Sequence, residues 1–258
     1  MGKRSEHFRI KIDDTVDFIN NDALCIITDN RILNKTKNVW RSKKDGRIYL
    51  IDEQNNEFLC SIERIEKNSI TLKKIEGTRT FSPSEKSVNL FIAALPINKM
   101  RLVVSAAVEL NVHSIQIFRS RFSKVNINKL NILRLKEIAR NATEQCKRLD
   151  IPEIKIVNNF NEALISAQNI GTVLFFHQDA RNKFDASVEL TDKLSVFVGP
   201  EGGFSENEIE FALSQEIIPY RFFDTTLRSE FFAISALAAI NWGQTSTIDK
   251  RRSFKFKV

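Results

Sequence analysis

The chain is poor in the residues that build metal centres. Its 258 residues include only three cysteines and three histidines. The cysteines, Cys25, Cys60 and Cys146, show no Cys-x-x-Cys spacing, and the histidines are just as dispersed. No group of Cys and His residues lies close enough together in the sequence to form a zinc site, so we expect no metal. Free thiols are typical of a reducing compartment, which favours a cytoplasmic protein.

Long apolar runs and common catalytic motifs are also missing. No apolar run reaches about 18 residues and the amino terminus has no apolar leader, so neither a membrane span nor secretion is predicted. The phosphate loop Gly-x-x-x-x-Gly-Lys-Ser/Thr and the dinucleotide loop Gly-x-Gly-x-x-Gly do not occur. No nucleophile triad can be identified. The sequence therefore excludes familiar ATP, NAD and hydrolase sites.

Glycine is scarce too, but it is concentrated in one place. Of eight glycines, Gly199, Gly202 and Gly203 fall within five residues. The apolar run 194–198 before them predicts a buried strand, and residues 205–208 (Ser-Glu-Asn-Glu) have the form of a helix capping box. This order places bare backbone at the carboxyl end of a strand, where open α/β sheets bind ligands. A tight turn without a ligand is the simpler interpretation.

Basic residues exceed acidic ones and are unevenly distributed. The chain has 39 Lys and Arg against 32 Asp and Glu, a net charge of +7 and a pI near 9.3. Residues 119–148 hold nine basic residues against two acidic ones, and residues 250–257 add five more. Solvated helix faces and a charged tail explain these runs as well as a surface for a phosphate backbone does. A polyanionic partner is permitted but not required.

The chain has two regions of different pattern. Residues 1–75 contain short β segments between polar turns, which predicts a small barrel or sandwich, and residues 76–87 form a linker. Residues 88–258 alternate strands and helices, which predicts a parallel sheet covered on both faces. The expected strands are 23–28, 48–51, 58–65, 69–75, 88–95, 114–118, 154–157, 172–177, 194–198 and 220–224, and the expected helices are 99–110, 129–149, 161–168 and 230–242. The last helix is apolar nearly all round and is expected to be buried.

Three loops leave strand carboxyl ends in the last third of the chain. They begin at His177, Gly199 and Asp224, and the third places Arg228 and Glu230 at the start of the last helix. That Arg–Glu pair fits either a structural role at the helix end or contact with a substrate. The glycine loop has no Lys or Arg, and its Glu201 would repel a polyphosphate. This favours an adenosine compound without phosphates.

Taken together, these residues resemble the RsmE family, bacterial 16S rRNA (uracil-N3-)methyltransferases of the SPOUT class. The resemblance covers most of residues 88–242. Its motifs are Ala-Leu-Pro at 94–96, Ala-Thr-Glu-Gln-Cys-Lys-Arg at 142–148, Ile-Pro at 151–152, Gly-Pro-Glu-Gly-Gly-Phe-Ser at 199–205 and Leu-Arg-Ser-Glu at 227–230. The chain departs from the family pattern where Phe231 and Phe232 replace Thr-Ala. We therefore expect Phe231 to make the mouth of the pocket bulkier.

The resemblance implies a SPOUT-type trefoil-knotted parallel sheet over residues 88–258 and a PUA-like, RNA-binding β-barrel over residues 1–75. It also implies a homodimer that transfers a methyl group from S-adenosyl-L-methionine to N3 of a uridine in 16S rRNA of the small ribosomal subunit. The cofactor-binding residues it implies are Leu174, Phe176, His177, Val198, Gly199, Pro200, Glu201, Gly202, Gly203, Thr226, Leu227 and Arg228.

Catalytic and RNA-binding roles follow from the same resemblance. The neutral imide of uracil is a poor nucleophile, so Arg228 is expected to stabilise its anion. Glu201 and Glu230 are candidates for orienting Arg228 or taking the proton. The RNA-binding candidates are Arg41, Arg119, Arg121 and Arg148. A non-catalytic RNA-binding or ribosome-assembly protein with the same fold is the alternative, and an α/β enzyme acting on a small nucleoside leaves the barrel and the basic residues unexplained.

Overall fold

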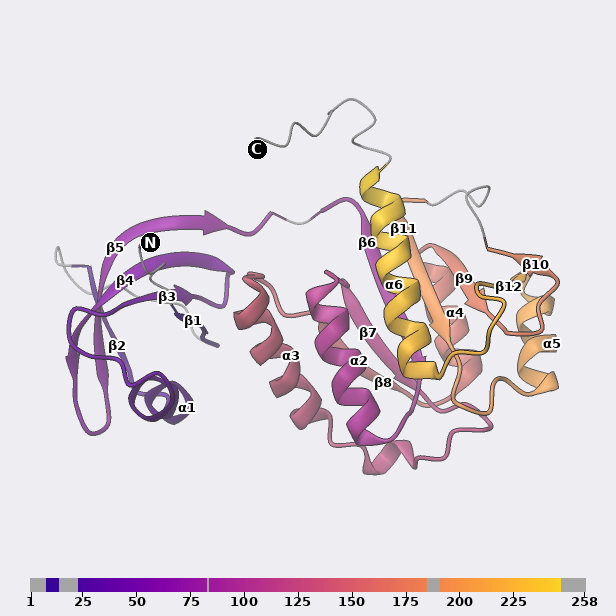
Figure 1. Cartoon of the computed structure of the whole chain (residues 1–258), viewed down its shortest axis with the longest axis horizontal. Coiled ribbons are helices and arrows are strands. Elements are labelled where there is room, and N and C mark those ends of the chain that lie inside the picture. The colour runs from indigo at the N-terminus through magenta and orange to yellow at the C-terminus, as the bar shows by residue number, and fades with distance from the viewer. Residues whose placement is uncertain (1–7, 14–22, 83, 185–190, 247–258) are drawn as a thin grey trace. The chain divides into compact units, whose positions relative to one another are not determined.

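The computed structural model describes residues 8–13, 23–82, 84–184 and 191–246. The chain divides into two compact units (Figure 1). The first comprises residues 1–83 and 143–150, and the second comprises residues 84–142 and 151–258. The basic tail at 250–257 lies outside the described residues.

The first unit is built on a mixed sheet of five strands. Their order is β1 (Phe8–Lys11), β3 (Arg47–Ile51), β4 (Asn56–Ile65), β5 (Ile70–Thr80) and β2 (Leu24–Ile27). β1 pairs in parallel with β3, and the other neighbours are antiparallel. A short helix, α1 (Asn30–Asn34), and a π-helical turn (Lys35–Val39) follow β2. Ile10, Ile48, Leu50, Ile62 and Leu72 are at the centre of its apolar core.

The strands predicted for this region are confirmed, with two differences. β1 and α1 were not predicted, because four alternating residues and a single helical turn give weak periodicity. β5 continues to Thr80, into the segment expected to be a linker. Its last residues stay paired with β4, where Asn56 lies opposite Thr80. Backbone pairing therefore extends the strand beyond the point where its apolar pattern ends.

The second unit contains a seven-stranded sheet that is parallel throughout, as predicted. The strand order is β10 (Asn182–Lys183), β12 (Pro219–Arg221), β9 (Thr172–Phe176), β11 (Lys193–Val198), β6 (Ser87–Ala93), β7 (Ser114–Phe118) and β8 (Glu153–Val157). Because all strands run the same way, every carboxyl end lies at one edge of the sheet. The loops that begin at His177 and Gly199 therefore leave the same edge.

Helices cover both faces of this sheet, as predicted (Figure 1). α2 (Ile97–Glu109), α3 (Ile132–Cys146, after a 3-10 turn at Ile127–Lys129) and α6 (Ser229–Ser246) contribute to one apolar cluster. α4 (Phe160–Ile170) and α5 (Glu206–Ser214) contribute to the cluster on the opposite face. Successive residues of β6 alternate between the two, since Leu90 belongs to the first cluster and Phe91 to the second. Burial on both faces explains why these strands are continuously apolar in sequence.

The final helix is only partly buried, which corrects the prediction of a buried helix. Ala236 and Ile240 are fully buried against the sheet and α2. Phe231 and Trp242 are 49% and 76% exposed. Within the described residues, one face of α6 packs against the sheet and α2, and the other carries exposed apolar side chains. Within the described ranges no helix combines the length and apolar character that a membrane span needs.

Candidate active site

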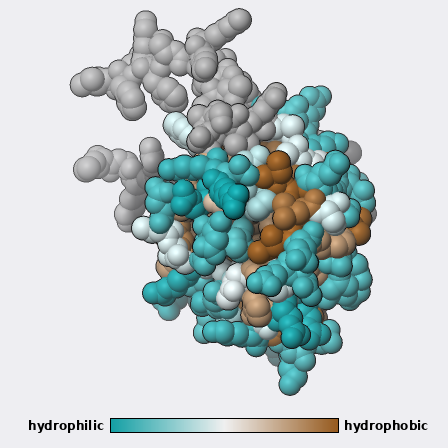
Figure 2. All heavy atoms as spheres, turned by 90° about the vertical axis from the view of Figure 1, so that its right-hand side faces the viewer, coloured by the Kyte–Doolittle hydropathy of each residue, from teal (hydrophilic) through white to brown (hydrophobic). Residues whose placement is uncertain are grey.

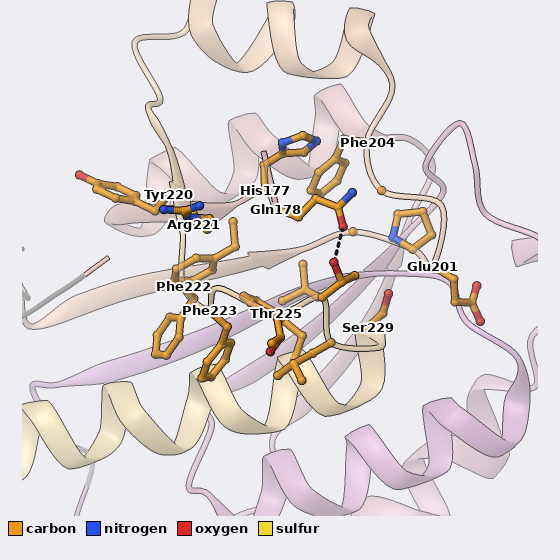
Figure 3. Close-up of a pocket in the computed structure, with 18 residues that line it drawn as sticks. His177, Gln178, Glu201, Phe204, Tyr220, Arg221, Phe222, Phe223, Thr225 and Ser229 are labelled. Carbon is orange, nitrogen blue, oxygen red and sulfur yellow. Dashed lines mark hydrogen bonds between the residues drawn. The ribbon is translucent and has the colours of Figure 1, made fainter. Parts of the chain in front are cut away.

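A pocket lies where the carboxyl ends of β9, β11 and β12 meet the start of α6 (Figure 3). It encloses about 650 Å³, counting the part that opens to solvent. Its walls are residues 176–178, residues 198–204 without Gly202, most of residues 220–227, Ser229 and Phe232. The three loops that the sequence predicts at strand ends thus line one cavity. A site built from several loops at this edge is typical of parallel α/β sheets.

The three clustered glycines serve different purposes. A Cβ at Gly199 would lie 3.0 Å from the ring of Phe204, and a Cβ at Gly202 would lie 3.0 Å from the Cβ of Phe122. These two glycines make room for side chains of the protein itself. Gly203 has a φ of +72°, which disfavours other residues, and the space beside it is open. Gly203 is therefore the position where bare backbone faces the pocket.

The body of the pocket is aromatic. Phe176 packs edge-on against Phe222 at 5.5 Å and Phe232 at 5.3 Å between ring centroids. Apolar side chains also gather on the side of the second unit that carries β12 and α5 (Figure 2). Phe232 lines the pocket, whereas Phe231 does not and is 49% exposed. The bulk expected at Phe231 is therefore supplied by Phe232, because α6 turns Phe231 outward.

Polar groups at the pocket rim connect its loops. The Thr226 hydroxyl donates to Gln178 Oε1 at 3.4 Å, the bond drawn as a dashed line in Figure 3. The backbone N–H of His177 donates to the carbonyl of Tyr220 at 2.9 Å. These bonds join the loop after β9 to the segment that runs from β12 to α6. The rim can offer amide, hydroxyl and imidazole groups to a ligand with a polar end.

An ion-pair cluster lies beside the glycine loop. Lys99, in the first turn of α2, places its Nζ 2.8 Å from Glu201 Oε1 and 3.2 Å from Glu230 Oε2. The Glu230 side chain is 5% exposed and that of Glu201 is 21% exposed. Burial raises the pKa of Glu201, but the hydrogen bond from Lys99, a backbone hydrogen bond and the charges of Lys99 and Lys124 together hold that pKa below its usual value. Both carboxylates are thus held by one ammonium group.

Sequence reasoning singled out both carboxylates but missed Lys99. The lysine is the third residue after Ala-Leu-Pro and is 102 positions from Glu201. A lone lysine in the first turn of a helix has no pattern that marks it. Its position beside a strand carboxyl end is the one signal that could have identified it.

The structure gathers most of the predicted cofactor-binding residues. All of them line the pocket except Leu174, Gly202 and Arg228. Leu174 is buried inside β9, and Gly202 faces Phe122. Arg228 is exposed, with its guanidinium 5.8 Å from the centre of the Phe231 ring. The three catalytic candidates therefore lie in two places. Glu201 and Glu230 bind Lys99, whereas Arg228 lies on the surface.

The predicted RNA-binding arginines belong to both units. Arg119 and Arg121 are exposed in the loop after β7 of the second unit. Arg41 is exposed in the first unit and has a φ of 50°. Arg148, also in the first unit, forms an ion pair with Asp150 at 2.7 Å, and its side chain is 8% exposed. Arg148 is therefore the least accessible of the four.

The parallel sheet and its pocket define an α/β protein with a ligand site at the carboxyl edge. Residues 82–241 match the sequence model of the RNA methyltransferase domain, and the chain belongs to this family. Within the part that the structure describes, no group of His, Cys, Asp and Glu residues could hold a metal ion.

Named relatives and a solved structure agree with this assignment. The chain is 27% identical over 225 residues to ribosomal RNA small subunit methyltransferase E of Rickettsia conorii, covering 85% of this chain and 90% of the relative. It is 25% identical over 219 residues to the protein of that name from Bacillus subtilis, covering 80% and 85%. The crystal structure of ribosomal RNA small subunit methyltransferase E from Neisseria gonorrhoeae, bound to S-adenosyl methionine, has the same fold, with a TM-score of 0.80, 23% identity and coverage of 92% and 97%. The resemblance stated from the sequence is confirmed.

Proposed function

We propose that this chain transfers a methyl group from S-adenosyl-L-methionine to N3 of a uridine in 16S rRNA of the small ribosomal subunit. The pocket carries the proposal, because its three loops meet at the carboxyl edge of the sheet in a member of the RNA methyltransferase family. Relatives named ribosomal RNA small subunit methyltransferase E support the choice of rRNA. The trefoil knot and the PUA-like character of the first unit are parts of this proposal.

The residues of the pocket suit a nucleoside with a positively charged sulfonium group. An aromatic wall around Phe176 and Phe232 can cover an adenine ring. Backbone of residues 198–203 and the Thr226–Leu227 segment would hold the adenosine, with Gly203 open to the pocket. The ionised Glu201 is compatible with a cation and opposes a polyphosphate. When bound, S-adenosylmethionine supplies an electrophilic methyl group.

The chain must then prepare the uracil. N3 lies on the pairing edge, so the nucleotide has to be unpaired or flipped before it can enter. The neutral imide is a poor nucleophile, and we assign Arg228, which is exposed at the start of α6 outside the pocket lining, to stabilise its anion through the carbonyl oxygens. Arg228 forms no ion pair within the described residues, so its charge is available to the substrate. Because the pKa of Glu201 is low, this carboxylate is a weak base and is better suited to orient groups than to take the proton.

Substrate binding and assembly complete the proposal. Arg41, Arg119, Arg121 and Arg148 are assigned to the phosphate backbone, where contacts position RNA without reading its sequence. The exposed apolar side chains of α6, among them Phe231, support a homodimer. A cytoplasmic location follows from a ribosomal substrate.

Calorimetric titration with S-adenosylmethionine tests the site. The parent chain should bind one equivalent, and Thr226→Trp should bind at least tenfold more weakly because its indole fills the pocket. Thr172→Trp is the matched control, since Thr172 is exposed at the other end of β9 and should leave the affinity unchanged. Absence of binding in a folded parent sample would contradict the proposal and favour the non-catalytic RNA-binding protein.

A further inference from the structure

Phe122 is an exposed aromatic residue beside the glycine loop. It lies in the loop after β7 at the carboxyl edge of the sheet, and it is 47% exposed. Its Cβ lies against Gly202, where an added Cβ would be only 3.0 Å away. Glu201 and Gly203 line the pocket, whereas Gly202 and Phe122 do not. The backbone at Gly202 thus separates the Phe122 ring from the pocket.

Hydrogen bonds hold the loop that carries Phe122. The backbone N–H of Arg121 donates to Glu208 Oε1 at 2.9 Å, and the other oxygen of this buried carboxylate accepts the N–H of Ser205 at 2.8 Å. One carboxylate therefore fixes both the Phe122 loop and the start of α5. The N–H of Ser123 also donates to the carbonyl of Ser120 at 3.1 Å, which closes a tight turn that contains Phe122. The ring is presented from a fixed backbone.

Three basic residues flank Phe122 in the sequence. Arg119, Arg121 and Lys124 are exposed, and none of the three forms an ion pair within the described residues. Lys124 lies close enough to Glu201 for its charge to act on that carboxylate. Fixed aromatic rings among unpaired cations are the usual means of binding single-stranded nucleic acid, because a base stacks while the cations hold phosphates.

We propose that the Phe122 ring is a stacking platform for an unpaired nucleobase next to the nucleotide held in the pocket. Arg119, Arg121 and Lys124 bind the phosphates on either side of that base. The inference rests on the proposed function, since it assumes that RNA approaches this edge of the sheet. Because Phe122 lies on the side of Gly202 away from the pocket, it contacts the RNA that flanks the target nucleotide and does not contact the methyl donor.

Two substitutions separate stacking from packing. Phe122→Leu keeps an apolar side chain over Gly202 but removes the aromatic face. With small ribosomal subunits from cells that lack this protein, it should raise KM about five- to a hundredfold, the range expected for one stacked base. Its affinity for S-adenosylmethionine should stay unchanged. Phe122→Trp should keep KM within about twofold of the parent. Leu133→Ala, which removes a 75% exposed apolar side chain from α3, should not change KM.

Fluorescence provides a direct measurement of stacking. Oligouridylate should quench the emission that Phe122→Trp adds to that of the parent, and salt should reverse the quenching. A parental KM in Phe122→Leu, or an added emission that oligouridylate does not change, would overturn the proposal. Weaker binding of S-adenosylmethionine by Phe122→Leu would overturn it too, because the ring would then support the glycine loop. If the parent transfers no methyl group, the proposed function fails, while quenching still reports whether a base stacks.

Discussion

A single ammonium group faces two carboxylates at the edge of the pocket. Lys99 lies 2.8 Å from Glu201 and 3.2 Å from Glu230, and both carboxylates are largely buried. Buried carboxylates that lose their counter-charge repel each other and are desolvated without compensation. Lys99 therefore fixes the charge and the position of Glu201 in the glycine loop and of Glu230 in the first turn of α6. Arg228 directly precedes α6.

Lys99→Met should lower kcat about ten- to a hundredfold, because displaced groups in a site cost rates of this order. It should also lower the melting temperature, more at pH 7 than at pH 4. Lys99 holds the pKa of Glu201 below its usual value, so the stability that this ion pair contributes is present above the unfolded-state pKa and is lost as pH falls, and its removal costs most at neutral pH. Thermal unfolding at both pH values measures this. An equal drop in melting temperature at the two pH values would contradict the role given to the Lys99 ion pairs. Lys129→Met, at an exposed lysine, serves as the control.

Arg228→Ala should lower kcat about a hundredfold or more while the melting temperature stays at the parental value. The magnitude is that of removing one group that stabilises charge in the transition state, and the fold should survive because Arg228 is exposed. Arg228→Lys should not restore the rate if a planar guanidinium must reach the uracil carbonyl oxygens. Methyl-transfer kinetics with saturating S-adenosylmethionine provide the measurement. Full activity in the alanine variant would remove Arg228 from the mechanism.

At the scale of elements, α5 and the loop after β7 depend on the same carboxylate. Glu208 is 8% exposed and accepts the N–H groups of Arg121 and Ser205. The predicted helix cap is confirmed, since α5 begins at Glu206 after Ser205. Sequence reasoning did not find the second bond, because Arg121 is 87 residues away. A capping residue thus also fixes a loop of the site.

Glu208→Gln should destabilise the second unit by about 1–2 kcal/mol, since one amide oxygen replaces two charged acceptors. Urea unfolding measures the change. Glu206→Gln, in the same turn but exposed, should cost less. An unchanged free energy of unfolding in Glu208→Gln would show that the two N–H groups find other partners.

Sequence patterns predicted the elements that form the pocket better than those of the first unit. The runs before His177 and Gly199 are apolar on both faces and have clear ends, so β9 and β11 were located within one residue. β1 and β10 are short edge strands whose pairing comes from the tertiary structure. The glycine loop was found because glycine is rare elsewhere in the chain. Lys99 and Phe122 were missed, because their partners in the site lie 80 or more residues away.

At the scale of the whole molecule, the proposed homodimer would use the exposed apolar side chains of α6. The helix is apolar nearly all round in sequence, yet Phe231 and Trp242 are exposed, as is Leu102 on the neighbouring α2. Exposed apolar side chains that gather on one face often mark surfaces for association. A second copy of the chain that covers α6 would explain why the sequence pattern predicted a buried helix.

Trp242→Glu should convert a dimer to a monomer, because a buried carboxylate without a partner opposes association. Light scattering coupled to gel filtration measures the mass of both proteins. Gln145→Glu, a charge change at an exposed position of α3, should leave the mass unchanged. A parent chain that is monomeric at micromolar concentration would contradict the homodimer.

Mass-spectrometric mapping of 16S rRNA tests the account most directly. In cells that lack this protein, one uridine should lose the mass of a methyl group, and nucleoside analysis should show that N3-methyluridine is the missing species. The parent gene should restore the modification, and the Arg228→Ala variant should not. A 16S rRNA with the same set of methylated nucleotides in the presence and absence of the protein would contradict the account.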